Sequence, residues 1–358
     1  MNTTSAPYRL QGYEVSYFTA KVRAALRYKG VWFDERRADI PDIRRRTGYV
    51  FIPIVVTPEG DTWQDSTEIY DRLEARHPDP PLFPSTPVQR IAAHLVELYT
   101  DEIALVPAMH YRWGVPEGES TTRMRFTAMI GNEEFGKAAA DKMAGARLAL
   151  GANDESAPAI EAHTRELLDA LSSHFELHPF LLGDRASFAD CACMGPLYAH
   201  LFTDLPSRRL LLETAFRVVG WIERCNYPNE DTQGAWLADD ALAPTFCELL
   251  RVMSRNAVPF LLAAVDAFEA WADGQTAGTQ PPRALGTVEV PWQGQTITRV
   301  VQSYTTWMVQ RTLDAYAALD PSARSAVDAA LLGTGWEPLL ARTLRHHITK
   351  DGFDLVLA

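Results

Sequence analysis

The chain has 358 residues, of which 47% are hydrophobic and 22% charged, so it is long enough for two or three globular domains. Its formal net charge of -12 argues against a nucleic-acid or acidic-membrane partner, because phosphate groups are bound by basic surfaces. No apolar run predicts a membrane span, and residues 1–7 lack the charged flank and apolar centre of a signal peptide, so we expect a cytoplasmic protein.

The first part of the chain alternates between strand and helix patterns. This order, with one strand that begins at a proline, is typical of a thioredoxin-like α/β domain. A proline-rich segment at 78–87 then predicts a stiff linker. The expected elements are strands at 8–13 and 31–37, a short helix or loop at 41–46, two strands around the Pro58–Asp61 turn, and helices at 19–28 and 66–76.

From Val88 onward the pattern is mostly helical. Ser187 and Asp190 have the spacing of a capping box at a helix start. We expect helices at 88–106 (ending at Pro107), 126–150, 158–174 and 213–225, with a polar interruption at 115–122. In the last third we expect helices at 244–253, 259–271 and 304–319, a hairpin at 288–300 with a Gln-Gly turn, and an apolar tail at 353–357.

The sequence predicts no metal centre. The four cysteines show no CxxC and no zinc-type spacing, so reduced, buried thiols are expected. Glu97, Asp101 and His110 have a spacing that a metal site can use. Carboxylate pairs on helices are more often solvated, and we expect no metal there.

Pro53 interrupts an apolar strand segment, Phe51 to Val56. Proline removes a backbone donor and is unfavourable inside a sheet, so its position needs a structural reason. A cis Ile52–Pro53 bond turns the neighbouring backbone outward, where an extended peptide ligand can pair with it. The alternative is a trans proline that begins an edge strand.

Four motifs occur in order between residues 8 and 225. They are Ser16-Tyr17-Phe18-Thr19-Ala20-Lys21-Val22-Arg23, the proline segment Phe51-Ile52-Pro53, the acid-serine pair Asp65-Ser66, and the capping motif Gly183 to Asp190. Together these motifs resemble the glutathione transferase family over residues 8–225, with the first similar to its serine-class motif and the second to its cis-proline segment. The resemblance implies a thioredoxin-like, glutathione-binding domain at 1–84, an all-α domain at 88–235 and a mostly helical C-terminal extension of unknown role at 236–358. It also implies a homodimer.

The serine-class motif implies that Ser16 is catalytic. A thiol becomes a useful nucleophile when a helix N-terminus and a hydroxyl donor stabilise its thiolate, and Ser16 precedes a helix. Tyr13 and Tyr17 are rival hydroxyls, and the interval of six residues to Val22 favours Ser16. A plain helix-leading serine is the structural alternative.

The remaining glutathione contacts follow from the same resemblance. Ile52 and Pro53 hold the cysteinyl backbone. Ser66 heads a helix and favours a carboxylate, while Asp65 pairs with an ammonium, and a γ-glutamyl group carries both charges. An ordinary Asp-Ser cap is the alternative for this pair. One of the three arginines at 44–46, assigned here as Arg45, is expected to bind the glycyl carboxylate.

An apolar or aromatic electrophile is the expected second substrate. Tyr17, Phe18, His110, Tyr111 and Trp113 are the expected cleft residues, and His110 is either an acid-base group or a core histidine. The sequence departs from the family in a long segment at 115–157 and in the C-terminal extension. The alternative function is therefore a non-catalytic member of the fold that binds glutathione or a protein partner.

Overall fold

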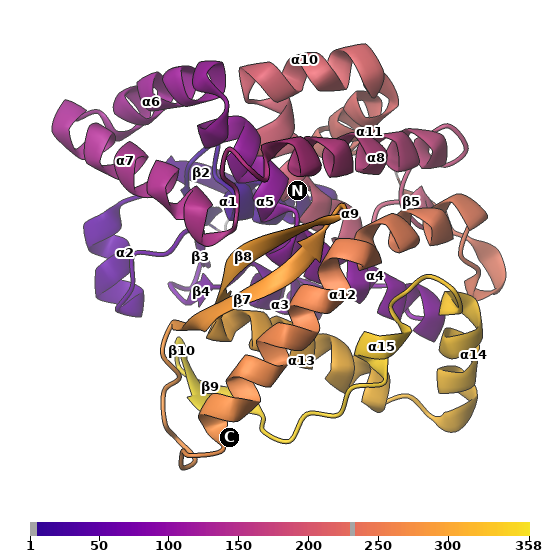
Figure 1. The fold of residues 1–358 in the computed structure, drawn as a ribbon. Helices are drawn as coiled ribbons and strands as arrows, with labels where there is room; N and C mark the ends of the chain where they lie inside the picture. The colour runs from indigo at the N-terminus through magenta and orange to yellow at the C-terminus, as the bar shows by residue number, and fades with distance from the viewer. Residues whose placement is uncertain (1–5, 230–232) are drawn as a thin grey trace.

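The computed structural model describes residues 6–229 and 233–358 (Figure 1). Met1 to Ser5, which make up most of the segment examined for a signal peptide, lie outside the described residues. A mixed four-stranded sheet has the order β2-β1-β3-β4, in which β1 and β2 are parallel and the other pairs antiparallel. Its elements are β1 (Tyr8–Gly12), α1 (Tyr17–Tyr28), β2 (Phe33–Arg37), α2 (Ile40–Thr47), β3 (Ile54–Val56), β4 (Thr62–Gln64) and α3 (Ser66–Arg76). This is the expected thioredoxin-like arrangement.

Helix α1 packs closely on the sheet because of the residues at its start. A Cβ at Gly12, the last residue of β1, would lie 2.3 Å from Thr19 Oγ1. Only glycine therefore lets α1 approach the end of β1 so closely. Val22 and Leu26 of α1 are fully buried beside Leu10 of β1 in the apolar core. The local sequence thus sets both the helix and the distance at which it packs.

The central part of the chain is helical, as expected. Several boundaries differ from the prediction: the helix expected at 126–150 is interrupted at Gly131, and the one expected at 213–225 is interrupted at Ala215. Pro107 does not end a helix: it lies near the start of α5, where its missing N–H costs no intrahelical hydrogen bond. The central elements are α4 (Pro87–Glu102), α5 (Leu105–Met109), η1 (His110–Gly114), α6 (Pro116–Ile130), α7 (Glu133–Ala149), α8 (Ala157–Phe175), β5 (Gly183–Arg185), α9 (Phe188–Met194), η2 (Gly195–Phe202), α10 (Leu205–Thr214) and α11 (Phe216–Asn226).

The prediction of a polar interruption at 115–122 was also wrong, because these residues begin α6. Pro116 is well placed in its first turn, and Gly131 ends it in the left-handed conformation at φ 69°. Helices α6 and α7 then lie against each other, joined by an ion pair of 2.6 Å between Arg123 and Asp141 (Figure 1). The predicted capping box of Ser187 and Asp190 is confirmed.

The C-terminal segment is mostly helical and contains two hairpins. The two helices expected at 244–253 and 259–271 are one long helix, α12, which continues through Pro259. The Gln293-Gly294 turn is confirmed, with both residues at positive φ. The expected apolar tail is a strand. The elements are β6 (Gln233–Trp236), η4 (Ala238–Asp240), α12 (Pro244–Ala272), β7 (Ala284–Trp292), β8 (Gln295–Gln302), α13 (Ser303–Ala317), α14 (Pro321–Leu331), α15 (Glu337–Leu340), β9 (Ile348–Asp351) and β10 (Asp354–Leu357).

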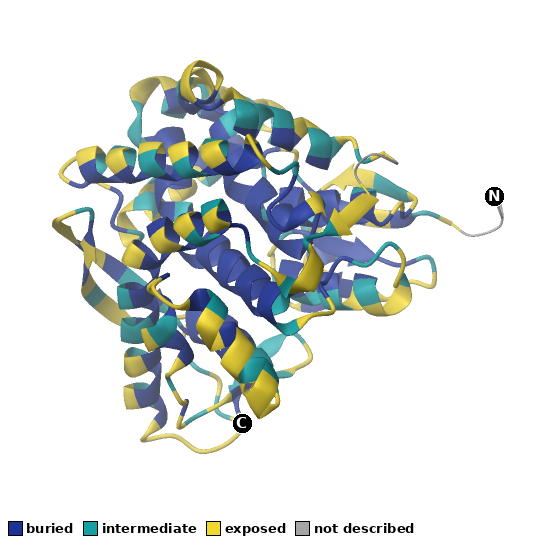
Figure 2. Ribbon diagram, turned by 90° about the vertical axis from the view of Figure 1, so that its right-hand side faces the viewer, coloured by how far each residue is buried: buried dark blue, intermediate teal, exposed yellow. Residues whose placement is uncertain are grey.

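One apolar core runs through all three parts of the chain. Leu10 in the sheet, Leu95 in α4 and Phe246 in α12 are fully buried members of the same cluster. Helix α12 packs on α4, α8 and α13, and buried segments run through the centre of the molecule (Figure 2). Within residues 6–229 and 233–358, no helix is long and apolar enough to cross a membrane.

Candidate functional site

Three predicted site segments meet at one edge of the sheet. Ser16 follows the end of β1, Pro53 directly precedes β3, and Asp65 directly follows β4. Gln11 of β1 pairs with Ile54 of β3, and Ile54 pairs with Gln64 of β4. The strand register therefore brings all three segments to the same end, beside the N-termini of α1 and α3.

Ser16 is the N-cap of α1. It lies in the extended region at φ -78° and ψ 129°, and its Oγ accepts a long hydrogen bond of 3.4 Å from the Thr19 N–H. That contact uses only an acceptor position, so the hydroxyl hydrogen is not consumed by it. The side chain is half-buried. A negatively charged sulfur beside it would meet a hydroxyl donor and the positive end of a helix dipole.

The Ile52–Pro53 peptide bond is cis, as predicted. Gln64 holds the segment from the neighbouring strand, because its Nε2 donates a hydrogen bond of 2.9 Å to the Phe51 carbonyl. Ile52 packs with Tyr13 on a small apolar cluster that contains Ile54. The turn before β3 is therefore fixed next to the Ser16 loop, with Pro53 buried and Phe51 exposed.

Asp65 is the N-cap of α3 in an unusual backbone conformation, at φ 78° and ψ 114°. Such a conformation costs on the order of 1–3 kcal/mol for a residue with a side chain, and it persists only where its surroundings hold it. Oδ1 of Asp65 accepts a hydrogen bond of 3.0 Å from the Thr67 N–H. Oδ2 accepts one of 2.8 Å from Tyr304 and one of 2.7 Å from Lys350, both in the C-terminal segment. Ser66, the first residue of α3, is buried beside it.

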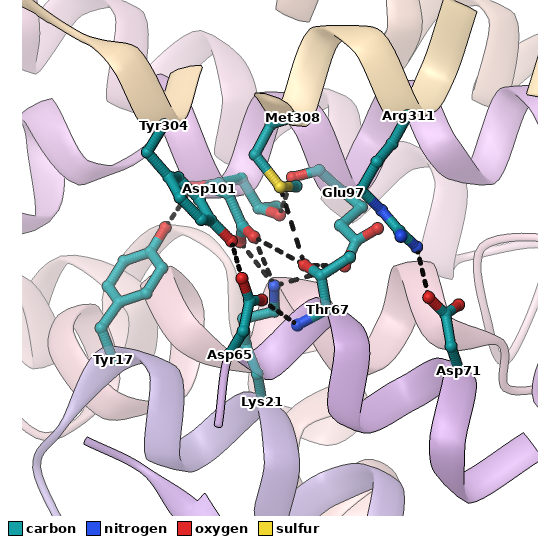
Figure 3. A network of polar contacts seen from close by, with 11 residues as sticks. Tyr17, Lys21, Asp65, Thr67, Asp71, Glu97, Asp101, Tyr304, Met308 and Arg311 are labelled. Atoms are coloured by element: carbon teal, nitrogen blue, oxygen red, sulfur yellow. Dashed lines mark hydrogen bonds and ion pairs between the residues drawn. The ribbon is translucent and has the colours of Figure 1, made fainter. Parts of the chain in front are cut away.

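The contacts of Asp65 lower its pKa. Burial alone would raise the pKa, but the charge and hydrogen bond of Lys350, together with the Tyr304 hydroxyl, outweigh burial. The carboxylate is therefore ionised at neutral pH and already has a cation as partner. Figure 3 shows α3 facing α13, with Asp65 opposite Tyr304 and Asp71 paired with Arg311.

A buried ionic cluster lies beneath the two helix starts. Lys21 of α1 is fully buried, with Nζ 2.6 Å from Asp101 and 3.4 Å from Glu97 of α4. Thr67 of α3 donates a hydrogen bond of 2.9 Å to Glu97 (Figure 3). Burial raises the pKa of Asp101, and Lys21 offsets this only in part. The cluster joins α1, α3 and α4 directly below the site.

The rival hydroxyls take different positions. Tyr17 is buried, and its hydroxyl donates a hydrogen bond of 2.5 Å to the Thr100 carbonyl. Burial, and then the charge of Asp101, raise the pKa of Tyr17 well above its ordinary value. Its ring also fills the space next to Gly195. Tyr17 is thus held between α1 and the helical region, whereas Tyr13 and Phe18 are half-buried.

Two of the three arginines of α2 pair with Asp42. Arg45 is exposed and forms an ion pair with Asp42, and Arg46 pairs with the same carboxylate at 2.8 Å. Arg46 also donates a hydrogen bond of 3.1 Å to Thr62 of β4, while Arg44 is exposed. Arg46, which the sequence reasoning did not select, is therefore the arginine of this group that contacts β4.

The expected second-substrate residues of η1 are buried and face different neighbours. His110 lies 3.1 Å from Glu161 of α8, and burial lowers the His110 pKa although Glu161 opposes this. Tyr111 belongs to the main core. Trp113 packs edge-on against Phe126 of α6.

The side chain of η1 that faces the Ser16 loop is Arg112. Its Nη1 donates a hydrogen bond of 2.9 Å to the Val15 carbonyl, and its Nε lies 2.7 Å from Asp204. Sequence reasoning selected the aromatic neighbours of Arg112 and not this residue; the one signal in the sequence was an arginine between two aromatic residues. In the described parts of the chain, no group of three His, Cys, Asp or Glu side chains is arranged to hold a metal ion.

Comparisons with known proteins agree with this geometry at the N-terminus. Residues 10–81 match the family model described as "Glutathione S-transferase, N-terminal domain". No curated protein matches the chain.

Several solved structures are similar at low sequence identity. A glutathione S-transferase from Methylobacterium radiotolerans, in complex with glutathione sulfonate, is 22% identical, with 65% of this chain and 99% of that chain covered and a TM-score of 0.39. Rice GST1 in complex with glutathione is 20% identical, with coverages of 64% and 91% and a TM-score of 0.41. FzlA from C. crescentus is 18% identical, with coverages of 68% and 99% and a TM-score of 0.41. Residues 10–81 belong to the glutathione S-transferase family as its N-terminal domain.

Proposed function

We propose that the chain is a glutathione transferase in which Ser16 stabilises the glutathione thiolate for attack on an apolar or aromatic electrophile. Ile52 and Pro53 hold the cysteinyl backbone, and Asp65 and Ser66 face the γ-glutamyl end. The observation that carries the proposal is the position of Ser16, at the N-terminus of α1 and at the same sheet edge as the cis Ile52–Pro53 bond. Both a thiolate and an extended peptide backbone find partners there.

The reaction is a substitution. The thiol proton passes to solvent as the thiolate forms, and the sulfur then bonds to the electrophilic carbon. With an aryl halide, the halide leaves with the electrons of the broken carbon–halogen bond. The chain's part is to hold the sulfur anion, through the Ser16 hydroxyl and the dipole of α1. The same thiolate can serve an isomerisation or a dehalogenation.

Turnover of an aryl halide with glutathione tests the proposal. A hydrogen bond to a charged group is worth about 1.5–3 kcal/mol, so Ser16→Ala should lower turnover about 10- to 100-fold. Ser16→Thr keeps the hydroxyl and should retain most activity. Calorimetry with millimolar glutathione measures binding separately. Absence of glutathione binding would refute the proposal, and so would equal turnover by wild type and Ser16→Ala.

A second function is favoured by the occupied Asp65. A chain whose own lysine pairs with this carboxylate can be a non-catalytic protein that binds glutathione or a protein partner. Glutathione binding without turnover, across aryl halides and other electrophiles, is the result that would favour it.

The remaining assignments of this proposal follow the family. Phe18 and the η1 residues His110, Tyr111 and Trp113 belong to the second-substrate side, and Arg45 is the proposed partner of the glycyl carboxylate. We also propose a cytoplasmic homodimer without a metal. Light scattering of the purified chain should give twice the chain mass, and a monomer would contradict this part.

A further inference from the structure

The carboxylate that the proposed function assigns to an ammonium already has one from its own chain. Oδ2 of Asp65 accepts hydrogen bonds from Lys350 and Tyr304, at 2.7 and 2.8 Å, and Oδ1 accepts one from the Thr67 N–H. Three of the roughly four acceptor positions of this carboxylate are thus taken. Only 9% of the Asp65 side chain is exposed.

Lys350 also neutralises the second acid of the first turn of α3. Its Nζ lies 2.8 Å from Glu68 and 5.4 Å from the centre of the Trp307 ring. Two carboxylates and an aromatic face stabilise an ammonium through charge-assisted hydrogen bonds and cation–π attraction, whether it belongs to a ligand or to the chain. Lys350 therefore occupies the position that the ammonium of a bound ligand would otherwise take.

The strand that carries Lys350 is fixed in place. Gln310 of α13 makes two hydrogen bonds with the backbone of Ile348, accepting from its N–H at 2.7 Å and donating to its carbonyl at 2.9 Å. Ile348 and Leu357, which pair at the end of the β9–β10 hairpin farthest from its turn, pack on Phe268 of α12. Lys350 is thus held by the core of the C-terminal segment.

The same hairpin also reaches the loop before the cis proline. The Tyr49 hydroxyl hydrogen-bonds Asp354 of β10, and the Tyr49 ring stacks on Phe51 at 5.2 Å. Arg283, just before β7, lies 5.0 Å from the Phe51 ring centre. The C-terminal segment therefore borders the site at both Asp65 and the cis-proline loop.

We propose that Lys350 sets a preference at this site for a thiol ligand with a carboxylate, and without an ammonium, at the end that faces α3, so that glutathione binds but less tightly than such a ligand. This inference rests on the proposed function and narrows it. A ligand ammonium would compete with Lys350 for Asp65 and would meet its positive charge at close range. A ligand carboxylate, in contrast, would meet the N-terminus of α3 at Ser66 and a nearby cation.

The test compares two ligands that differ only in the ammonium. One is glutathione, and the other is the same tripeptide with a glutaryl group in place of the γ-glutamyl group. Calorimetry would measure both against wild type and Lys350→Met, which keeps an apolar stem over Trp307. Lys350→Arg keeps the positive charge, and Lys142→Met removes one charge from an exposed position of α7.

Wild type should bind the glutaryl ligand about tenfold more tightly than glutathione, the effect of about one charge-assisted hydrogen bond. In Lys350→Met the preference should reverse, while Lys350→Arg and Lys142→Met should keep it. A preference for glutathione in wild type that Lys350→Met leaves unchanged would overturn this inference and leave the proposed function standing. Failure of wild type and of every variant to bind either ligand would overturn both. If Lys350→Met does not fold, Lys350→Gln replaces it with the same expectation.

Discussion

Two helices begin at the same edge of the sheet, and their first residues are in opposite states. Ser16, at the start of α1, has ordinary extended backbone angles and one long acceptor contact. Asp65, at the start of α3, has a strained backbone and is engaged by three donors, two of them from the C-terminal segment. The end of the site proposed for the thiol is thus left with an unused donor, while the end proposed for the amine is filled.

Backbone strain and the hydroxyl proposed for thiol binding thus lie at two different helix starts of the same site. The conformation of Asp65 is unfavourable by itself, and its ion pair and hydrogen bonds offset that cost. Ser16 needs no such support, so its hydroxyl is free to change partners. In the proposals above, the C-terminal segment therefore acts on ligand choice at α3, and Ser16 at the start of α1 stabilises the thiolate.

The largest effect should come from removing the support that both helix starts share. Lys21→Met leaves the buried carboxylates of Asp101 and Glu97 without their cation, so the free energy of unfolding should fall by about 3–5 kcal/mol. Urea unfolding measures it. Arg45→Met, which removes an exposed ion pair, should change stability by less than about 1 kcal/mol. Similar losses in both variants would show that the cluster does not support the site.

Asp65→Asn should weaken the contacts between the start of α3 and the C-terminal segment and leave the Ser16 loop unchanged. Asparagine keeps the cap on Thr67 but loses the charged partner of Lys350, so stability at pH 7 should fall by about 1.5–3 kcal/mol. Because the folded pKa of Asp65 lies below its ordinary value of 3.8, this contribution is complete above that pH and is lost as pH falls through the folded pKa. The gap between wild type and variant should therefore be constant from about pH 5 to 7 and narrow below about pH 4. A gap that widens in acid would contradict the pairing.

Tyr49→Phe should loosen the hairpin at its second contact with the site. The variant keeps the stack on Phe51 and loses the hydrogen bond to Asp354, so we expect a loss of about 0.5–1.5 kcal/mol. Thermal unfolding measures it, with Tyr227→Phe as an exposed control. An unchanged melting temperature would mean that this contact does not hold the hairpin.

The smallest effect on stability should be that of Ser16→Ala. Its cap hydrogen bond is long, at 3.4 Å, so the loss should be about 0.5–1 kcal/mol. The same variant should show the large loss of turnover described above. A stability loss greater than about 2 kcal/mol would instead identify Ser16 as a structural cap.

Sequence reasoning succeeded where the signal is local. The cis bond before Pro53, the capping box of Ser187 and Asp190, and the start of α3 at Ser66 are each encoded by neighbouring residues. It failed where a proline suggested a break. Pro259 lies inside α12 because the residues around it are buried against α4, α8 and α13, and that packing outweighs the lost hydrogen bond.

The contact between Asp65 and the C-terminal segment was not predictable in this way. Lys350 and Asp65 are separated by 285 positions, and the strand that carries Lys350 has no distinctive pattern. Arg112 was hidden among aromatic neighbours for a similar reason: its partners Val15 and Asp204 lie far from it in sequence. Pairing over such distances depends on the tertiary fold, which local propensities do not specify.

The largest apolar cluster runs from the sheet into the C-terminal segment, so we expect the chain to unfold as one cooperative unit. Trp336, buried at the start of α15, donates its indole N–H to the Leu250 carbonyl and belongs to the same apolar cluster as Leu10 beneath the site. A ligand that binds only the folded chain stabilises every part of such a unit by the same free energy. An unfolding curve followed by tryptophan fluorescence should therefore shift when a ligand occupies the sheet edge, although Trp336 does not contact that edge.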